Sequence, residues 1–188
     1  MRISGGIHRS RLLTSPRGAS TRPTSDRVRE ALFSILESRG AVAGARVLDL
    51  YAGTGALGLE ALSRGATFAT FVDSDRRALE ALARNVDALR ERKRTRVVAL
   101  AASRAAVVLA GDGASLVFCD PPYAQLEAAL AALASVAEHH VLAPGATVVL
   151  EHAARDTPRL DPSVPLRETD ARRYGDSALT LYEFVPPP

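Results

Sequence analysis

The 188 residues of the chain are enough for one folded domain, and a hydrophobic content of 47% is ample for a buried core. No apolar run approaches the ~18 residues needed to cross a membrane, and a single cysteine leaves neither a disulfide framework nor a zinc pattern. We see no signal peptide, and we expect a cytoplasmic protein with no membrane contact and no bound metal.

The net charge of +3 is unevenly spread along the chain. Residues 1–25 hold no acidic residue but carry Arg2, His8, Arg9, Arg11, Arg17 and Arg22. A basic arm on a nearly balanced body is typical of a protein with a phosphate-rich partner, although a solvated basic tail has the same composition. Arginine content by itself is a weak argument for RNA binding, because 23 of the 24 basic residues are arginine and the chain is rich in alanine, as in a GC-rich genome.

The first predicted elements are a small hairpin and a helix. Residues 2–4 and 11–13 can pair around Gly5 and Gly6. Thr24 or Ser25 can cap a helix whose apolar residues recur at helical spacing from Val28 onward. We expect this helix to end at Gly40.

From residue 46 onward, strands and helices alternate. We expect strands over 47–51, 68–73, 97–101, 116–119 and 147–151, and helices over 56–64, 75–91, 103–110 and 124–140. This alternation indicates right-handed βαβ units and a parallel sheet with helices on both faces. Residues 166–174 and 178–185 flank Gly175 and Asp176, which predicts an antiparallel hairpin. A parallel sheet that ends in such a hairpin is the order expected of a Rossmann-like methyltransferase.

A glycine-rich loop follows the first of these strands, in the run V-L-D-L-Y-A-G-T-G-A-L-G over 47–58. Its glycines also satisfy G-x-G-x-x-G, so a dinucleotide is the alternative ligand. Asp73 ends the next strand, where a carboxylate can bind the ribose hydroxyls of either cofactor. Asp49 favours S-adenosylmethionine, because a carboxylate just before the loop repels a pyrophosphate but attracts an α-ammonium group.

The strand over 116–119 ends in Asp120-Pro121-Pro122-Tyr123. Two prolines lack the N–H groups that a sheet needs, so the strand stops at a rigid turn. The Asp120 carboxylate and the Pro121 carbonyl can each accept a hydrogen from an exocyclic amine, while Tyr123 can stack on the base. We interpret the turn as a site of methyl transfer to a base nitrogen; a turn that merely ends a strand is the alternative. Cys119 fits a buried core residue better than a nucleophile that attacks cytosine.

Taken together, these motifs resemble the RsmD family, bacterial 16S ribosomal RNA guanine-N2 methyltransferases. The resemblance spans essentially the whole chain and lies in segments 2–6, 9–13, 21–33, 48–55, 120–123 and 173–176. DNA adenine methylases share the glycine and D-P-P-Y motifs, whereas the R-P-T-S-D-R-V-R-E segment over 22–30 is much more specific.

The resemblance implies an α/β, Rossmann-like methyltransferase with a mostly parallel seven-stranded sheet and a small N-terminal hairpin extension. We expect an RNA-contacting extension over 1–23, a methyltransferase domain over 24–185 and a disordered tail over 186–188. The implied reaction moves one methyl group from S-adenosylmethionine to N2 of a single guanine in 16S ribosomal RNA, within a partly assembled small subunit. We expect the enzyme to act as a monomer.

The resemblance also assigns residues to roles. The target amine would contact Asp120, Pro121, Pro122 and Tyr123. The cofactor would contact Asp49, Ala52, Gly53, Thr54, Gly55, Asp73, Ser74, Ala102, Ser103 and Thr24. The RNA would contact Arg2, His8, Arg9, Arg11 and Arg22. In related enzymes, Arg22 and Thr24 fall in the loop that closes over the methionine end of the cofactor.

One position departs from the pattern of such enzymes. Many carry Asp or Asn after the third strand, where it reads adenine N6, but here the sequence is Leu100-Ala101-Ala102-Ser103. Backbone groups and Ser103 would then hold the adenine. Two other functions stay open: a DNA methyltransferase acting on adenine N6 or cytosine, and an RNA-binding assembly factor. The first is disfavoured because the chain has no target-recognition domain beyond its short arm.

Overall fold

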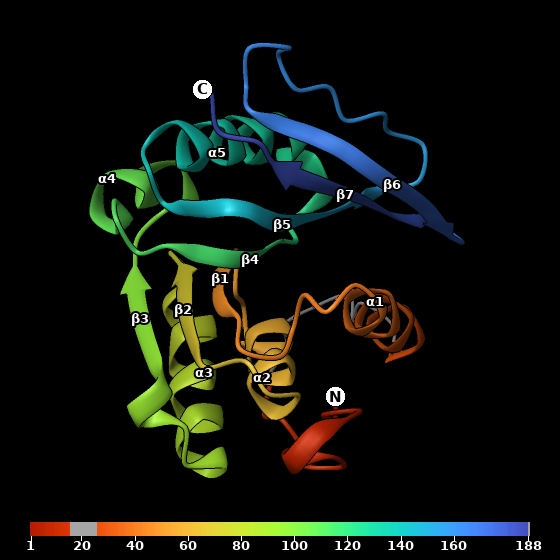
Figure 1. The fold of residues 1–188 in the computed structure, drawn as a ribbon. Helices are drawn as coiled ribbons and strands as arrows, with labels where there is room; N and C mark the ends of the chain where they lie inside the picture. Colours follow the sequence, from red (N-terminus) through yellow and green to blue (C-terminus); the bar gives the residue numbers. More distant parts are fainter. Residues whose placement is uncertain (16–25, 188) are drawn as a thin grey trace.

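A computed structural model describes residues 1–15 and 26–187 of the chain. Seven strands form one sheet in the order β3-β2-β1-β4-β5-β7-β6, with helices on both faces (Figure 1). Strands β1 to β5 are parallel, whereas β7 runs antiparallel to both β5 and β6. The predicted α/β fold with a terminal antiparallel hairpin is therefore confirmed.

The strands are β1 Arg46–Leu50, β2 Phe68–Asp73, β3 Thr95–Ala99, β4 Ala114–Cys119, β5 Leu142–Ala153, β6 Leu166–Tyr174 and β7 Ser177–Phe184. The α-helices are α1 Asp26–Ser38, α2 Ala56–Ser63, α3 Arg76–Leu89, α4 Ala105–Leu109 and α5 Leu126–Glu138. Short 3₁₀ turns are η1 Gly6–His8, η2 Arg92–Arg94, η3 Ala102–Arg104 and η4 Tyr123–Gln125. None of the described helices has the length and apolar character to span a bilayer.

Strands β3 and β5 differ most from their predicted bounds, whereas β1, β4 and β7 differ by one or two residues. Strand β3 begins and ends two residues earlier than predicted, because the Leu100 N–H donates to the Val98 carbonyl and turns the chain out of the sheet. Strand β5 is longer than the predicted 147–151, since Leu142 already pairs with Ala114 of β4 and Ala153 pairs with Ser177 of β7. The shorter β3 places Leu100 and Ala101 between the strand and the candidate residues Ala102 and Ser103, which begin η3.

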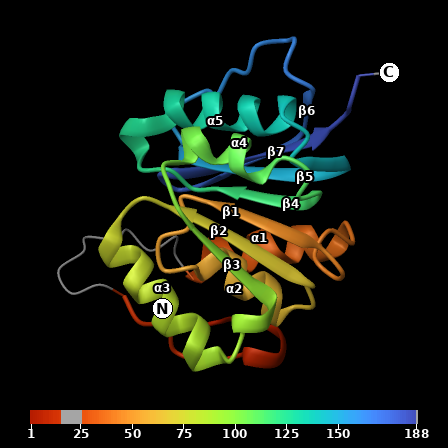
Figure 2. The same ribbon diagram turned by 90° about the vertical axis from the view of Figure 1, so that its left-hand side faces the viewer.

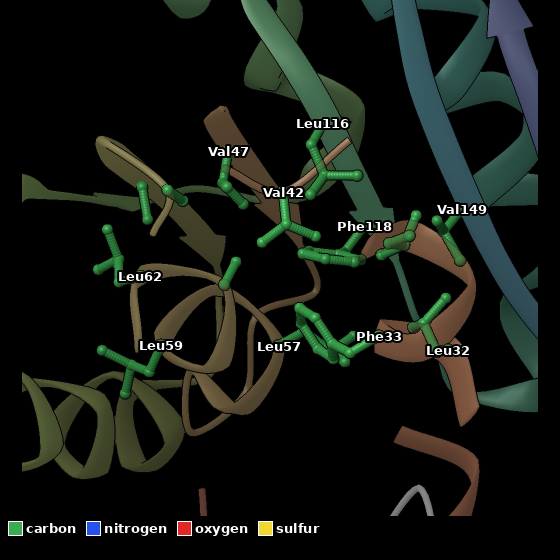
Figure 3. Close-up of a cluster of buried hydrophobic side chains, with 14 of the residues drawn as sticks. Leu32, Phe33, Val42, Val47, Leu57, Leu59, Leu62, Leu116, Phe118 and Val149 are labelled. Carbon is green, nitrogen blue, oxygen red and sulfur yellow. The ribbon is translucent and has the colours of Figure 1, made fainter. Parts of the chain in front are cut away.

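The sheet has a hydrophobic core on each face. Helices α1, α2 and α3 cover one face and helices α4 and α5 cover the other (Figure 2). Phe118 of β4 packs on Phe33 of α1, with ring centroids 5.7 Å apart, in the first core (Figure 3). Cys119 points the other way, into the second core, where burial raises the pKa of its thiol well above the usual range. This confirms that Cys119 is a core residue.

The N-terminal residues form the predicted small hairpin. Arg2 pairs with Leu12, and the Leu13 N–H donates to the Met1 carbonyl at 3.0 Å. Because Ile3 and Leu13 are buried in the hydrophobic core of the α/β domain, the alternative of a solvated tail is wrong for residues 1–15. The predicted helix cap at Thr24 or Ser25 and the predicted domain boundary at residue 23 lie outside the described residues. The predicted disorder of 186–188 stays a prediction.

Candidate active site

Three carboxylates converge at the carboxyl edge of the sheet. Asp49 lies one residue before the end of β1, Asp73 ends β2, and Asp120 follows β4. Since β1 pairs with β2 on one side and with β4 on the other, the loops after these strands are neighbours. The chain changes direction across the sheet between β1 and β4, which is where open α/β sheets bind their ligands.

The glycines of the loop after β1 have different physical roles. A Cβ on Gly55 would lie 2.4 Å from Leu82 Cδ1, and one on Gly58 would lie 2.3 Å from Phe71 Cε1. These two glycines are therefore required by packing against α3 and β2. A Cβ on Gly53 would meet nothing closer than the Tyr51 carbonyl at 3.9 Å, although its φ of +56° favours glycine. Gly53 is thus the glycine that leaves open space for a ligand beside the backbone.

Asp49 is a buried carboxylate held by the loop it precedes. Its Oδ2 accepts the Gly58 N–H at 2.9 Å. Burial is the main cause that raises the pKa of Asp49 to about 8; the Gly58 bond lowers the pKa, and the nearby charges of Asp120 and Asp73 add smaller increases that are already part of this value. A buried acid beside two others is stabilised in its ionised form by a cation, so the site favours an ammonium group over a pyrophosphate.

Asp73 closes the same loop from the neighbouring strand. Its Oδ2 accepts the Gly53 N–H at 2.7 Å, and its Oδ1 accepts the Asp75 N–H at 2.8 Å. Each carboxylate oxygen can accept more than one hydrogen bond, so the geometry leaves capacity for ribose hydroxyls. Ser74, the next residue, is exposed at this edge.

The D-P-P-Y turn is tied to the C-terminal hairpin. Pro121 is buried and Asp120 is half-buried, and the Pro122 carbonyl accepts the Gln125 N–H at 2.8 Å as η4 begins. The Tyr123 hydroxyl donates to the Asp176 carbonyl at 3.2 Å and lies 3.1 Å from Ser177 Oγ. The turn between β6 and β7 therefore holds the Tyr123 ring at the rim of the site.

A family model described as "Conserved hypothetical protein 95" matches residues 1–183. The chain belongs to this family, the RsmD family. YlbH of Bacillus subtilis is 36% identical over 97% of this chain and 92% of its own length. Ribosomal RNA small subunit methyltransferase D of Escherichia coli is 44% identical over 65% of this chain and 60% of its own. The solved structure of yhhF from Escherichia coli superposes with a TM-score of 0.83 at 32% identity, covering 100% of this chain and 99% of that one.

Membership of the RsmD family confirms the predicted methyltransferase class. The described residues also bring most of the predicted cofactor residues to one edge of the sheet: Asp49, Ala52, Gly53, Thr54, Gly55, Asp73 and Ser74. Ala102 and Ser103 follow β3 at the same edge, with Ala102 buried and Ser103 exposed. In the part of the chain that the structure describes, no group of three or more His, Cys, Asp or Glu is placed to hold a metal ion.

The predicted RNA-binding residues lie elsewhere. Arg2, Arg9 and Arg11 are exposed on the N-terminal hairpin. His8 is half-buried and already has a partner within the protein, because its Nε2 lies 2.6 Å from Glu91 Oε1. Arg22 and Thr24 lie outside the described residues.

Sequence reasoning missed Asn85, a buried residue of α3. Its Nδ2 donates to the Thr54 carbonyl at 2.9 Å and to the Thr14 carbonyl at 3.0 Å, and its Oδ1 accepts the Thr14 N–H at 2.7 Å. One side chain thus joins the glycine loop to the base of the N-terminal hairpin. The signal was present in the sequence: the only asparagine of the chain stands among the inward-facing apolar residues of a strongly amphipathic helix.

Proposed function

We propose that this protein methylates the exocyclic N2 of a guanine in 16S ribosomal RNA, as part of the small ribosomal subunit. The methyl donor is S-adenosylmethionine, which supplies a methyl group on a sulfonium centre. The observation that carries the proposal is the D-P-P-Y turn, which is fixed beside the glycine loop and Asp49 at the switch point of the sheet. An Escherichia coli relative named ribosomal RNA small subunit methyltransferase D supports RNA as the substrate.

The residues at the edge of the sheet fit this donor. Asp49 would pair with its ammonium group, Asp73 would accept its ribose hydroxyls, and the open space at Gly53 would admit it close to the backbone. Its adenine would lie by Ala102 and Ser103, which offer backbone groups and one hydroxyl but no acid or amide.

The chemistry at the turn is one of positioning. The lone pair of an exocyclic amine is delocalised into the base, and it becomes available when both N–H groups have acceptors. The Asp120 carboxylate would accept one and the Pro121 carbonyl the other, while Tyr123 stacks on the base. Holding the nitrogen in line with the methyl group supplies much of the rate. No covalent intermediate with the protein is needed, and Asp120 can accept the proton that leaves the amine.

A nucleoside assay tests the proposal against the DNA alternative. The protein is incubated with labelled S-adenosylmethionine and, in separate reactions, with unmethylated small subunits, naked 16S RNA and duplex DNA. We expect label in N2-methylguanosine from the subunits. Label only in methyladenine or methylcytosine from DNA would overturn the proposal. A protein that binds small subunits but labels no nucleic acid would instead be an assembly factor.

A further inference from the structure

Two basic segments, far apart in the sequence, lie side by side in the fold. Residues 1–15 carry three arginines and no acid, and residues 90–96 carry five basic residues and one acid. Because the whole chain has a net charge of +3, all its other residues together carry −4. The hairpin crosses the far end of α3, next to the η2 turn (Figure 2). The fold therefore joins two segments that carry net charges of +3 and +4, whereas the rest of the chain has a net negative charge.

Specific contacts fix the hairpin in this place. Glu60 of α2 is fully buried and accepts the N–H groups of Ser4 and Gly5, at 2.8 and 2.9 Å. Ser63, one turn later, accepts the His8 N–H at 2.9 Å and donates to the Gly5 carbonyl at 2.6 Å. Such a dense set of bonds to a buried helix makes the hairpin a rigid part of the surface.

Further contacts join the hairpin to the end of α3. His8 pairs with Glu91, and the Arg11 guanidinium donates to the Ala88 carbonyl at 2.9 Å. Four exposed cations in this region have no ion pair among the described residues: Arg9, Arg84, Arg90 and Lys93. Neighbouring cations do have acidic partners, as Arg92 does in Asp87 and Arg94 in Glu91. The hairpin and the end of α3 thus bring several uncompensated cations close together.

We propose that Arg9, Arg11, Arg84, Arg90 and Lys93 form one basic face that binds RNA phosphates at a distance from the methyl-transfer site. The proposal rests on the proposed function in taking the polymer to be RNA. Helix α3 runs from the carboxyl edge of the sheet, at Asp73, to this face, and its 14 residues rise roughly 20 Å. An RNA that contacts both the face and the methyl-transfer site must therefore extend along α3. The face can thus contribute to binding only when the RNA is long enough to span this distance.

Two double variants, each with two cations replaced by glutamine, test whether the basic face binds RNA. In the double variant Arg90→Gln and Lys93→Gln, we expect affinity for a long 16S fragment to fall about tenfold. The slope of log affinity against log salt concentration should also become less steep, by roughly the amount expected for the loss of one to two phosphate contacts. The control is Arg39→Gln with Arg167→Gln, which removes the same charge near the opposite edge of the sheet. A short oligonucleotide carrying the target guanine should bind all three proteins equally. Equal losses in both double variants would overturn the proposal.

A second variant tests the rigid placement of the hairpin without any change in charge. Ser63→Ala removes the two bonds that hold Gly5 and His8. A fixed face predicts weaker binding of the long RNA by about threefold to tenfold, whereas an independent charged tail predicts no change. Calorimetric affinity for S-adenosylmethionine should stay at the wild-type value in every variant. If the wild-type protein does not methylate the long RNA at all, the proposed function fails, which is a different result from equal RNA affinity in all variants.

Discussion

The two ends of helix α3 lie in opposite electrostatic surroundings. At its start, Asp49, Asp73 and Asp120 gather at the carboxyl edge of the sheet; at its far end, the basic face of the hairpin and η2 carries unpaired cations. A cluster of carboxylates suits a cationic methyl donor but repels a polyanion. Because the two regions are separate, one protein can bind both the cationic donor and the polyanion. Mutations can therefore disrupt one binding region without affecting the other.

The largest expected effect is at Asp120. Asp120→Asn keeps the size of the side chain but replaces a charged acceptor with an amide, so methyl transfer should fall by about 10²–10⁴-fold. Affinity for S-adenosylmethionine and for long RNA should change little, as measured by calorimetry and filter binding. A variant that stays active would refute the role of Asp120 as acceptor for the target amine.

Asp49 should make stability depend on pH. Its pKa is about 8 in the folded protein and near 3.8 when exposed, so the unfolded chain loses this proton first. The contribution of Asp49 to the free energy of unfolding is therefore highest below pH 4. It is lost as pH rises toward 8, by at most about 1.4 kcal/mol per pH unit. In Asp49→Asn, which can still accept the Gly58 N–H, the fall between pH 5 and 8 should shrink in thermal melts. An unchanged slope would contradict the assignment.

Donor binding by the wild-type protein should show the opposite trend. An ammonium group pairs with ionised Asp49, so affinity for S-adenosylmethionine should rise as pH increases toward 8. Calorimetry in buffers of different ionisation enthalpy should detect a released proton below that pH. Proton release of the same size in Asp49→Asn would assign the effect to another group.

Asn85 should affect the cofactor loop through its bond to Thr54. Asn85→Ala leaves a buried carbonyl without its donor, and we expect donor affinity to weaken by about 1–2 kcal/mol. Val86→Ala is the matched control, since it shortens a buried neighbour on the same helix without touching the loop. Equal loss of stability in both variants, with donor affinity unchanged in both, would make Asn85 a structural residue only.

The smallest effect is expected at Tyr123. Tyr123→Phe keeps the ring but removes the bonds to Asp176 and Ser177, so the Michaelis constant for RNA should rise about threefold, roughly 0.5–1 kcal/mol. Tyr123→Ala should cost more, because the stacking surface is lost as well. Equal effects of the two changes would mean that the hydroxyl, and not the ring, does the positioning.

The parallel part of the sheet could be predicted because its signals are local: β1, β2 and β4 are short, mostly apolar runs, and the loop after β1 contains Gly53 and Gly55. Strand β3 was misplaced by two residues because, as an edge strand, it leaves Val97 exposed and so lacks a clear burial pattern. The placement of Asp49, Asp73 and Asp120 follows from topology, since all three end neighbouring parallel strands. Asn85 could be noticed as a lone asparagine on an apolar helix face, but its partner Thr14 and the partner Gly5 of Glu60 could not be assigned, because they lie 71 and 55 residues away and nothing local in the sequence pairs them.

The docking of the hairpin has a consequence for how the protein is made. Its first 15 residues leave the ribosome before any of the groups that hold them, since Glu60, Ser63, Asn85 and Glu91 all lie later in the chain. The N-terminal segment therefore has no anchor until α2 has been synthesised, and it gains its remaining contacts only with α3 and η2. The Met1 carbonyl accepts the Leu13 N–H, so a fusion partner placed before Met1 would slow the docking of the hairpin. A fusion partner placed after the C-terminus would not affect this docking.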